Sequence, residues 1–343
     1  DRGAAVNQTM MMSGITPLLV ASIKGHLDLA HILLERGAAM NLAAVNGITP
    51  LFITAQESYL ETVQLLSDRG AVVNQAKTTN GTTPLLIAAD KGHLEVAQLL
   101  LDSGANMNQA KATDGATPLL IAADKGHLEV VQLLLDRGAA VNQATGGEMT
   151  ASEYEIFHEM FGGGGDSDAH RYDNGTTPLF SAAKTGHLEV VRLLLDHGAA
   201  VNQAVYYGET PLMNAVACGH FEIAQLLLDR MAAVNQADNE EYTPLGVAVL
   251  TGHLQLVQLL LERGANITHL TKSLEDGRTP GVAELITASE EARALAQQGD
   301  EEPFRVHIKA AEFCALYAQW VPVLPAAARS RLVTWAKASV RDS

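Results

Sequence analysis

The triplet Thr-Pro-Leu returns along the chain at a nearly constant interval. Seven intact copies precede a degenerate Thr-Pro-Gly at Thr279, and they begin at Thr16, Thr49, Thr83, Thr117, Thr177, Thr210 and Thr243. The successive intervals are 33, 34, 34, 60, 33, 33 and 36 residues, so one interval is about 27 residues too long. A fixed period of this length is typical of a solenoid, in which each repeat is one small structural unit.

The residues of one repeat predict a pair of short helices. Thr83 is a good N-cap, and Pro84 pre-sets the backbone at the first helical position, so we expect a helix over residues 84–91. Gly92 then allows a tight turn into a second helix, which Gly104 ends. The apolar residues of this second helix fall on one side: Leu94, Ala97, Leu100 and Leu101.

Neither helix is stable alone. Isolated helices shorter than roughly 12 to 15 residues are marginal in water, and neither helix of the pair can cover its apolar side. Neighbouring repeats must therefore stack on one another. The sequence predicts an all-α solenoid of helix-turn-helix units joined by polar connectors.

Three motifs in one register resemble the ankyrin repeat. They are Gly-x-Thr-Pro-Leu, Gly-His-Leu-Glu-Val and Leu-Leu-x-x-Gly-Ala-x-x-Asn, and together they cover roughly residues 1–298. The resemblance implies antiparallel helix pairs in a right-handed stack, with finger loops projecting to one side. It also implies a concave face, built from first helices and fingers, that binds protein partners.

The domain organisation follows from the repeats. Residues 1–298 form the predicted array, with an insertion at about 145–171 inside the long interval. The opening run DRGAAVNQ matches the end of a repeat, so we expect the array to start within a repeat. Residues 299–343 are predicted to be a helical C-terminal extension.

Composition excludes several classes of protein. Two cysteines, Cys218 and Cys314, are too few for a disulfide framework, which indicates an intracellular and most simply a cytoplasmic protein. An incomplete N-terminus leaves organelle targeting open. The formal net charge of −16 argues against nucleic acid as the partner, and no segment predicts membrane insertion. The oligomeric state stays open.

No residues predict an enzyme, a metal site or a cofactor. Six of the twelve histidines recur at the Gly-His position, one per repeat. Metal ligands or a catalytic dyad must converge on one point, so a structural role explains these histidines better. The glycine-rich run at 161–168 lacks the strand and the Lys-Ser/Thr helix of a phosphate-binding loop.

Candidate binding residues are those that differ between repeats on the implied concave face. On the first helices they are Lys24, Gln56, Asp90, Lys91, Asp124, Lys125, Lys184 and Cys218, and on the fingers they are Tyr206, Tyr207, Glu209, Glu240 and Tyr242. Tyrosine is a frequent interface anchor. The finger set predicts a partner with apolar and basic features. The alternative is that these tyrosines pack against adjacent fingers.

The insertion carries an aromatic stripe. Tyr154, Phe157 and Phe161 recur at helical spacing among acidic residues, which favours a docking arm. A segment folded back on its own repeats and a disordered loop are the alternatives.

The tail reverses the charge of the chain. Residues 303–343 carry six basic and two acidic side chains and are predicted to form two helices. A cap for the last repeat is one interpretation. A second docking module is the other, and its candidate residues are Trp320, Arg329, Arg331 and Trp335.

The sequence therefore predicts a non-catalytic scaffold or adaptor that binds proteins through the concave face, the insertion arm and the basic tail. A permanent subunit of a large assembly is the alternative. A substrate adaptor of a ubiquitin ligase is a third, because the tail distantly resembles a SOCS box at Cys314 and Leu324-Pro325 but departs from it at Ala310 and Ala327.

Overall fold

The computed structural model describes residues 6–10, 12–146 and 175–266. These residues form fourteen helices and no strand, as the repeat pattern predicts. The chain divides into two compact units, residues 1–232 and 233–343. The insertion and the tail predicted from the sequence lie outside the described residues.

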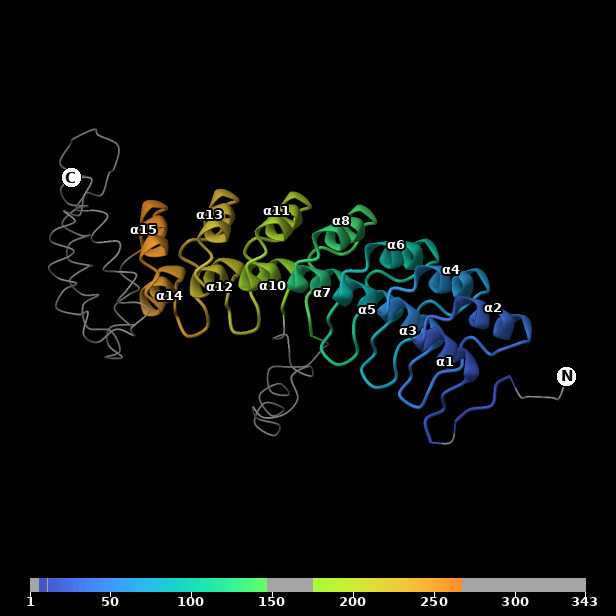
Figure 1. Cartoon of the computed structure of the whole chain (residues 1–343). Coiled ribbons are helices and arrows are strands. Elements are labelled where there is room, and N and C mark those ends of the chain that lie inside the picture. The colour runs from blue at the N-terminus through green and yellow to red at the C-terminus, as the bar shows by residue number, and fades with distance from the viewer. Residues whose placement is uncertain (1–5, 11, 147–174, 267–343) are drawn as a thin grey trace, which may run out of the picture. The chain divides into compact units, whose positions relative to one another are not determined.

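Every repeat of the described chain supplies one helix pair (Figure 1). The first helices of the first unit are α1 (Pro17–Ile23), α3 (Pro50–Gln56), α5 (Pro84–Lys91), α7 (Pro118–Lys125), α10 (Pro178–Thr185) and α12 (Pro211–Ala217). Its second helices are α2 (Leu27–Glu35), α4 (Leu60–Asp68), α6 (Leu94–Asp102), α8 (Leu128–Asp136), α11 (Leu188–Asp196) and α13 (Phe221–Asp229). In the second unit, the described pair is α14 (Pro244–Thr251) and α15 (Leu254–Glu262).

Each first helix is capped by the threonine that the sequence predicts as its N-cap. The Thr83 hydroxyl oxygen accepts a hydrogen bond from the Leu86 N–H at 3.2 Å, and Pro84 occupies the first helical position. The same cap recurs in all seven described repeats. At the other end of α5, Gly92 adopts φ 72°, a conformation that costs glycine little. The cap and the glycine set the bounds of the helix.

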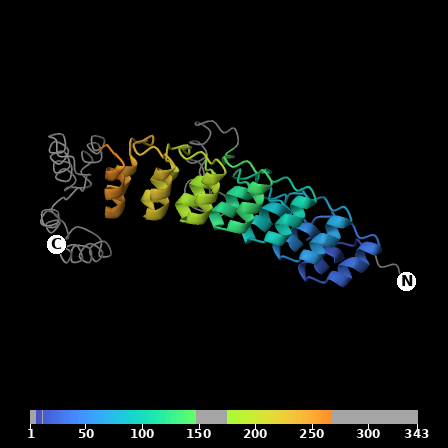
Figure 2. The same cartoon turned by 90° about the horizontal axis from the view of Figure 1, so that it is seen from above.

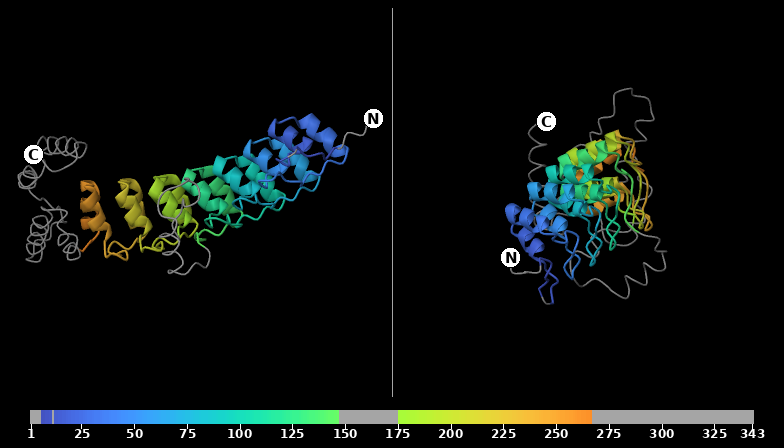
Figure 3. Two further views of the ribbon diagram at one scale, coloured as in Figure 1. Left: turned by 90° about the horizontal axis from the view of Figure 1, so that it is seen from below. Right: turned by 90° about the vertical axis from the view of Figure 1, so that its right-hand side faces the viewer.

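The first unit is a two-layer stack. Each first helix packs against its own second helix and against the first helices of the neighbouring repeats. Figure 2 shows these pairs succeeding one another in chain order, and the end-on view of Figure 3 separates the two helical layers from the fingers. Small and medium apolar side chains fill the interface between repeats, among them Leu86, Ala116, Leu120 and Ile121.

The repeated histidines join neighbouring repeats. The His93 Nε2–H donates to the Gln56 carbonyl at 3.0 Å, and the His127 Nε2–H donates to the Asp90 carbonyl at 3.0 Å. The His127 ring also lies over Gly92 of the preceding repeat, since a Cβ at Gly92 would be 2.6 Å from His127 Nδ1. The structural role predicted for these histidines is confirmed at these junctions.

The stack continues across the insertion. The His187 Nε2–H donates to the Asp124 carbonyl at 3.1 Å, although the two residues flank the long interval. The Asn142 side chain accepts from the Ala200 N–H at 2.7 Å and donates to the Gly198 carbonyl at 3.3 Å. Because Asn74 makes the equivalent bonds to Asn106 and Gly104, the two repeats that flank the insertion stack like uninterrupted neighbours.

Candidate protein-binding surface

The predicted first-helix residues occupy one row in the first unit. They lie at or next to the C-terminal ends of successive first helices, on the layer from which the fingers extend (Figure 1). Adjacent first helices pack side by side, so the row runs from α1 to α12. This first-helix row comprises Lys24, Gln56, Asp90, Lys91, Asp124, Lys125, Lys184 and Cys218.

Some charges of the first-helix row are already engaged within the protein. Asp90 Oδ2 lies 3.6 Å from Lys91 Nζ, and this partly exposed pair contributes little to stability. The Asp124 carboxylate accepts a hydrogen bond from the Ser181 hydroxyl at 2.8 Å, which links α7 to α10. Asp124 is therefore held in place by the repeat that follows the insertion.

Two polar residues on this side were not predicted from the sequence. Ser181 and Asn214 are buried at the position that isoleucine holds in α3 and α7, where Ile53 and Ile121 stand. The Asn214 amide donates to Glu209 Oε2 at 2.9 Å and so orients a predicted binding residue of the adjacent finger. The replacement of isoleucine by serine and asparagine at this repeat position is the sequence feature that could have predicted them.

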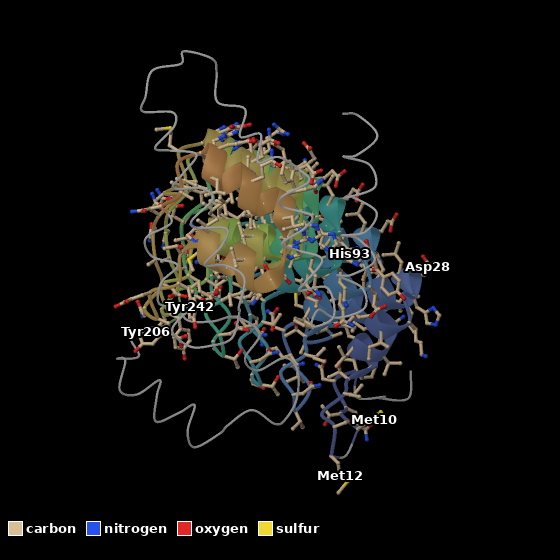
Figure 4. All side chains as sticks on the ribbon, turned by 90° about the vertical axis from the view of Figure 1, so that its left-hand side faces the viewer. Met10, Met12, Asp28, His93, Tyr206 and Tyr242 are labelled. Carbon is tan, nitrogen blue, oxygen red and sulfur yellow. The ribbon has the colours of Figure 1, made fainter. Side chains whose placement is uncertain are left out.

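The finger after α11 presents an aromatic pair. The rings of Tyr206 and Tyr207 meet edge to face, with centroids 5.2 Å apart and planes at 78°. Tyr207 is exposed and Tyr206 is half-buried; Figure 4 labels Tyr206 on its finger. The edge-to-face packing presents one ring to solvent and supports it with another.

The predicted tyrosine patch divides between the two units. Tyr242 and Glu240 belong to the finger that precedes α14 in the second unit. The Tyr242 N–H donates to Asp238 Oδ1 at 2.8 Å, and the Glu240 N–H donates to the same atom at 3.0 Å. Asp238 thus shapes this finger as an Asx turn.

The first two fingers carry apolar side chains that the sequence analysis did not single out. Met12 is 99% exposed, Val45 is 74% exposed and Met10 is 61% exposed. Figure 4 places Met10 and Met12 on one finger, with Met12 at its tip, and the Val45 N–H donates to the Ser13 carbonyl at 3.0 Å across the two fingers. We call Met10, Met12 and Val45 the N-terminal finger patch. Exposed methionines are common at protein-binding surfaces, and the run Met10 to Met12 was the available signal.

The first described helix pair exposes residues that later repeats bury. Leu29 of α2 is 43% exposed, whereas its counterparts Val96 and Ile223 are 0% and 2% exposed. Val20 of α1 is also exposed, and its counterpart Ile121 is buried. In the described residues this side of α1 and α2 is a bare apolar surface.

The described residues contain neither a metal-binding cluster nor a membrane-spanning helix. No group of three or more His, Cys, Asp or Glu side chains there could hold a metal ion. None of the described helices has the length and apolar character needed to cross a membrane. The insertion residues Tyr154, Phe157 and Phe161 and the tail residues Trp320, Arg329, Arg331 and Trp335 lie outside the described part of the chain.

The family model for ankyrin repeats in sets of three copies matches residues 2–77, 73–145, 149–238 and 207–271. The chain belongs to the ankyrin-repeat family. Ankyrin repeats are general protein–protein interaction modules and are generally non-catalytic. The family assignment confirms the fold and the general function expected from the sequence.

One similar solved structure is the ankyrin repeat domain of Bcl-3, described as a unique member of the IkappaB protein family. It is 25% identical over 72% of this chain and 99% of its own chain, with a TM-score of 0.57. No match was found among curated proteins.

Proposed function

We propose that this ankyrin-repeat protein is a non-catalytic scaffold or adaptor that binds a partner protein through its first-helix row and fingers. The observation that carries the proposal is the contrast between repeats. Most buried positions repeat closely, whereas the exposed first-helix positions differ over much of the stack, from Lys24 and Gln56 to Lys184 and Cys218. The Asp-Lys pair shared by α5 and α7 is the exception. Exposed positions tolerate substitution at little cost in stability, so this side of the stack is free to be shaped by a partner.

Two regions of the first unit would supply most of the binding energy. The N-terminal finger patch offers apolar area, and the finger with Tyr207 offers a supported aromatic ring. A few such anchors dominate a typical interface, and surrounding polar groups exclude water and fix the register. The first-helix row, with Lys125 and Lys184 exposed, fits the second role.

The test is a binding measurement with matched variants. The double substitution Val45→Ser and Tyr207→Ser should weaken affinity for a partner recovered from native extract by at least about tenfold. The control is Val72→Ser, because Val72 is also an exposed valine but follows α4 away from the finger tips. Equal losses in both variants, or no loss in either, would exclude the fingers as the principal site.

A permanent subunit of a large assembly is the second candidate function. Interface size and composition separate it from the adaptor, because obligate interfaces are more apolar than transient ones and commonly exceed about 2,000 Å². A complex that keeps fixed stoichiometry in high salt would support the permanent subunit. Weak and salt-sensitive capture would support the adaptor.

The insertion arm and the tail belong to the proposal on sequence grounds alone. Deletion of residues 146–171 should remove particular partners if the arm recognises them. Whether residues 299–343 form a cap, a docking module or a SOCS-box-like adaptor surface is tested by the same capture with the tail removed. The cytoplasmic location rests on the two cysteines and is part of the proposal.

A further inference from the structure

The second helices carry one polar pattern on their outer side. In α8 the residues Glu129, Gln132, Leu133 and Asp136 recur at helical spacing, and in α11 the equivalent residues are Glu189, Arg192, Leu193 and Asp196. We call these two sets the outer stripes. Each places a half-buried leucine between two exposed carboxylates.

The outer carboxylates lack lysine partners on their own helices. In α8 the Gln132 amide donates to Asp136 Oδ1 at 2.7 Å, which supplies a hydrogen bond but no positive charge. All lysines in the described residues lie in the first helices, at their ends or in the fingers: Lys24, Lys77, Lys91, Lys111, Lys125 and Lys184. Arginines offset part of the negative charge on the outer side, since Glu189 pairs with Arg192 and Asp196 pairs with Arg230. Carboxylates still outnumber arginines on the second helices and at their ends.

Cross-repeat ion pairs distinguish the junction between α8 and α11 from its neighbours. Between α6 and α8, Arg137 Nη1 lies 2.8 Å from Asp102 Oδ1. Between α11 and α13, Arg230 Nη2 lies 2.7 Å from Asp196 Oδ1. Between α8 and α11, histidine replaces the arginine at the equivalent position. His197 Nε2 lies 4.0 Å from Asp136 Oδ1, and the imidazole is charged only when protonated. This junction has no arginine clamp.

A groove of about 570 Å³ lies at this junction, lined by residues of α6, α8 and α11. Its apolar lining comes from Leu94, Leu128, Leu133 and Leu193. Four carboxylates and the Arg192 guanidinium line its sides, which gives the lining a formal charge of −3. The groove is separate from the first-helix row and the fingers.

We propose that the α8–α11 groove binds a basic amphipathic helix of a partner protein. The partner helix would place its apolar residues at i, i+3 or i+4 and i+7 over the leucines. Lysine or arginine side chains on both flanks would then face Glu129 and Asp136 on one side and Glu189 and Asp196 on the other. Each outer stripe is about 10 Å long, so roughly two turns of the partner would make the central contacts.

The charge of Arg192 should oppose the binding of a basic helix. Arg192 is the single cation in the groove lining, and its Nε lies 3.5 Å from Glu189 Oε2. Glutamine stands at the equivalent position in α4, α6, α8 and α13, so Arg192→Gln has a precedent in this same stack. Removal of this cation should tighten the binding of a basic helix.

The experiment uses the full chain and two synthetic helices labelled with fluorescein. Both peptides carry leucines at i, i+4, i+7 and i+11; one is flanked by lysine and arginine, and the other has glutamate at the same positions. Fluorescence anisotropy should detect binding of the basic peptide, with affinity falling as salt rises, and little binding of the acidic peptide. If the basic peptide does not bind, or the acidic peptide binds equally well, the proposal is wrong.

Matched variants locate the binding. The pair Glu129→Gln and Glu189→Gln should weaken the basic peptide severalfold, while Arg192→Gln should strengthen it. The control pair, Glu61→Gln and Glu222→Gln, makes the same charge change at equivalent positions of α4 and α13, outside the groove. Equal weakening by both pairs would show that the peptide is attracted diffusely to an acidic surface, and it would overturn the proposal that the groove binds the helix.

A zero-length carbodiimide cross-link gives a readout that needs no variant. Lysines of the bound peptide should join to carboxylates in 129–136 and 189–196, and cross-links confined to other helices would contradict the proposal. The outcome is independent of the finger-side function, because the two surfaces share no residue.

Discussion

At the residue scale, local chemistry sets the start of each first helix. The threonine hydroxyl satisfies an N–H that has no partner within the helix, and the following proline cannot offer one. Both effects act within four residues of the chain. This is why the helix starts could be predicted from the sequence before any packing was known.

We predict that Thr83→Ala destabilises the protein by about 1 kcal/mol, because the Leu86 N–H loses its cap. The control is Thr79→Ala, since Thr79 is exposed in the preceding finger and caps no helix. Urea denaturation followed by circular dichroism measures both. Equal effects of the two substitutions would show that the cap does not stabilise α5.

A second prediction concerns the bare apolar side of α2. Leu100→Ala should cost about 2–5 kcal/mol, because Leu100 is fully buried between repeats. Leu29→Ala should cost less than about 1 kcal/mol, because Leu29 is 43% exposed and its truncation leaves no closed cavity. If thermal unfolding gives the two substitutions similar costs, the side of α2 that carries Leu29 is covered in solution.

At the element scale, contacts between a histidine ring and a glycine set the spacing of repeats at three described junctions, where His127, His187 and His220 lie on Gly92, Gly126 and Gly186. A Cβ at Gly126 would lie 2.5 Å from ring atoms of His187, whereas a Cβ at Gly104 would meet nothing within 4 Å. Both glycines have positive φ, 74° and 88°. The backbone strain of an alanine is therefore common to both sites, and only Gly126 adds a clash.

We predict that Gly126→Ala is more destabilising than Gly104→Ala by about 1–3 kcal/mol. Chemical denaturation of the two variants measures the difference. Hydrogen exchange in α10 and α11 should also rise in Gly126→Ala, because this junction holds the repeat after the insertion. Equal costs would mean that the histidine ring moves aside freely and does not set the spacing.

The limits of sequence reasoning lie at this same scale. The repeat period predicted the helix pairs and the structural role of the histidines, because both follow from residues of a single repeat. It did not predict the hydrogen bond from Ser181 to Asp124, the exposure of Met12 and Val45, or the groove between α8 and α11. Each of these depends on how two neighbouring repeats pack against one another, which the sequence of a single repeat does not determine.

At the scale of the whole molecule, the charges are segregated. The lysines of the described residues lie on the first-helix and finger side, whereas the second helices and their ends carry arginines and a larger number of carboxylates. The net charge of −16 is therefore a poor guide to any one surface. A stack of this kind can present two sides of different chemistry to two partners.

The central claim is that a partner protein binds the first-helix row and the fingers. Hydrogen–deuterium exchange of the full chain, with and without a partner recovered from native extract, tests it most directly. We predict protection of the fingers at residues 10–16, 43–49 and 205–210 and of the C-terminal ends of α5, α7 and α10. Protection confined to the second helices, with the fingers exchanging at the same rate in both samples, would contradict the claim.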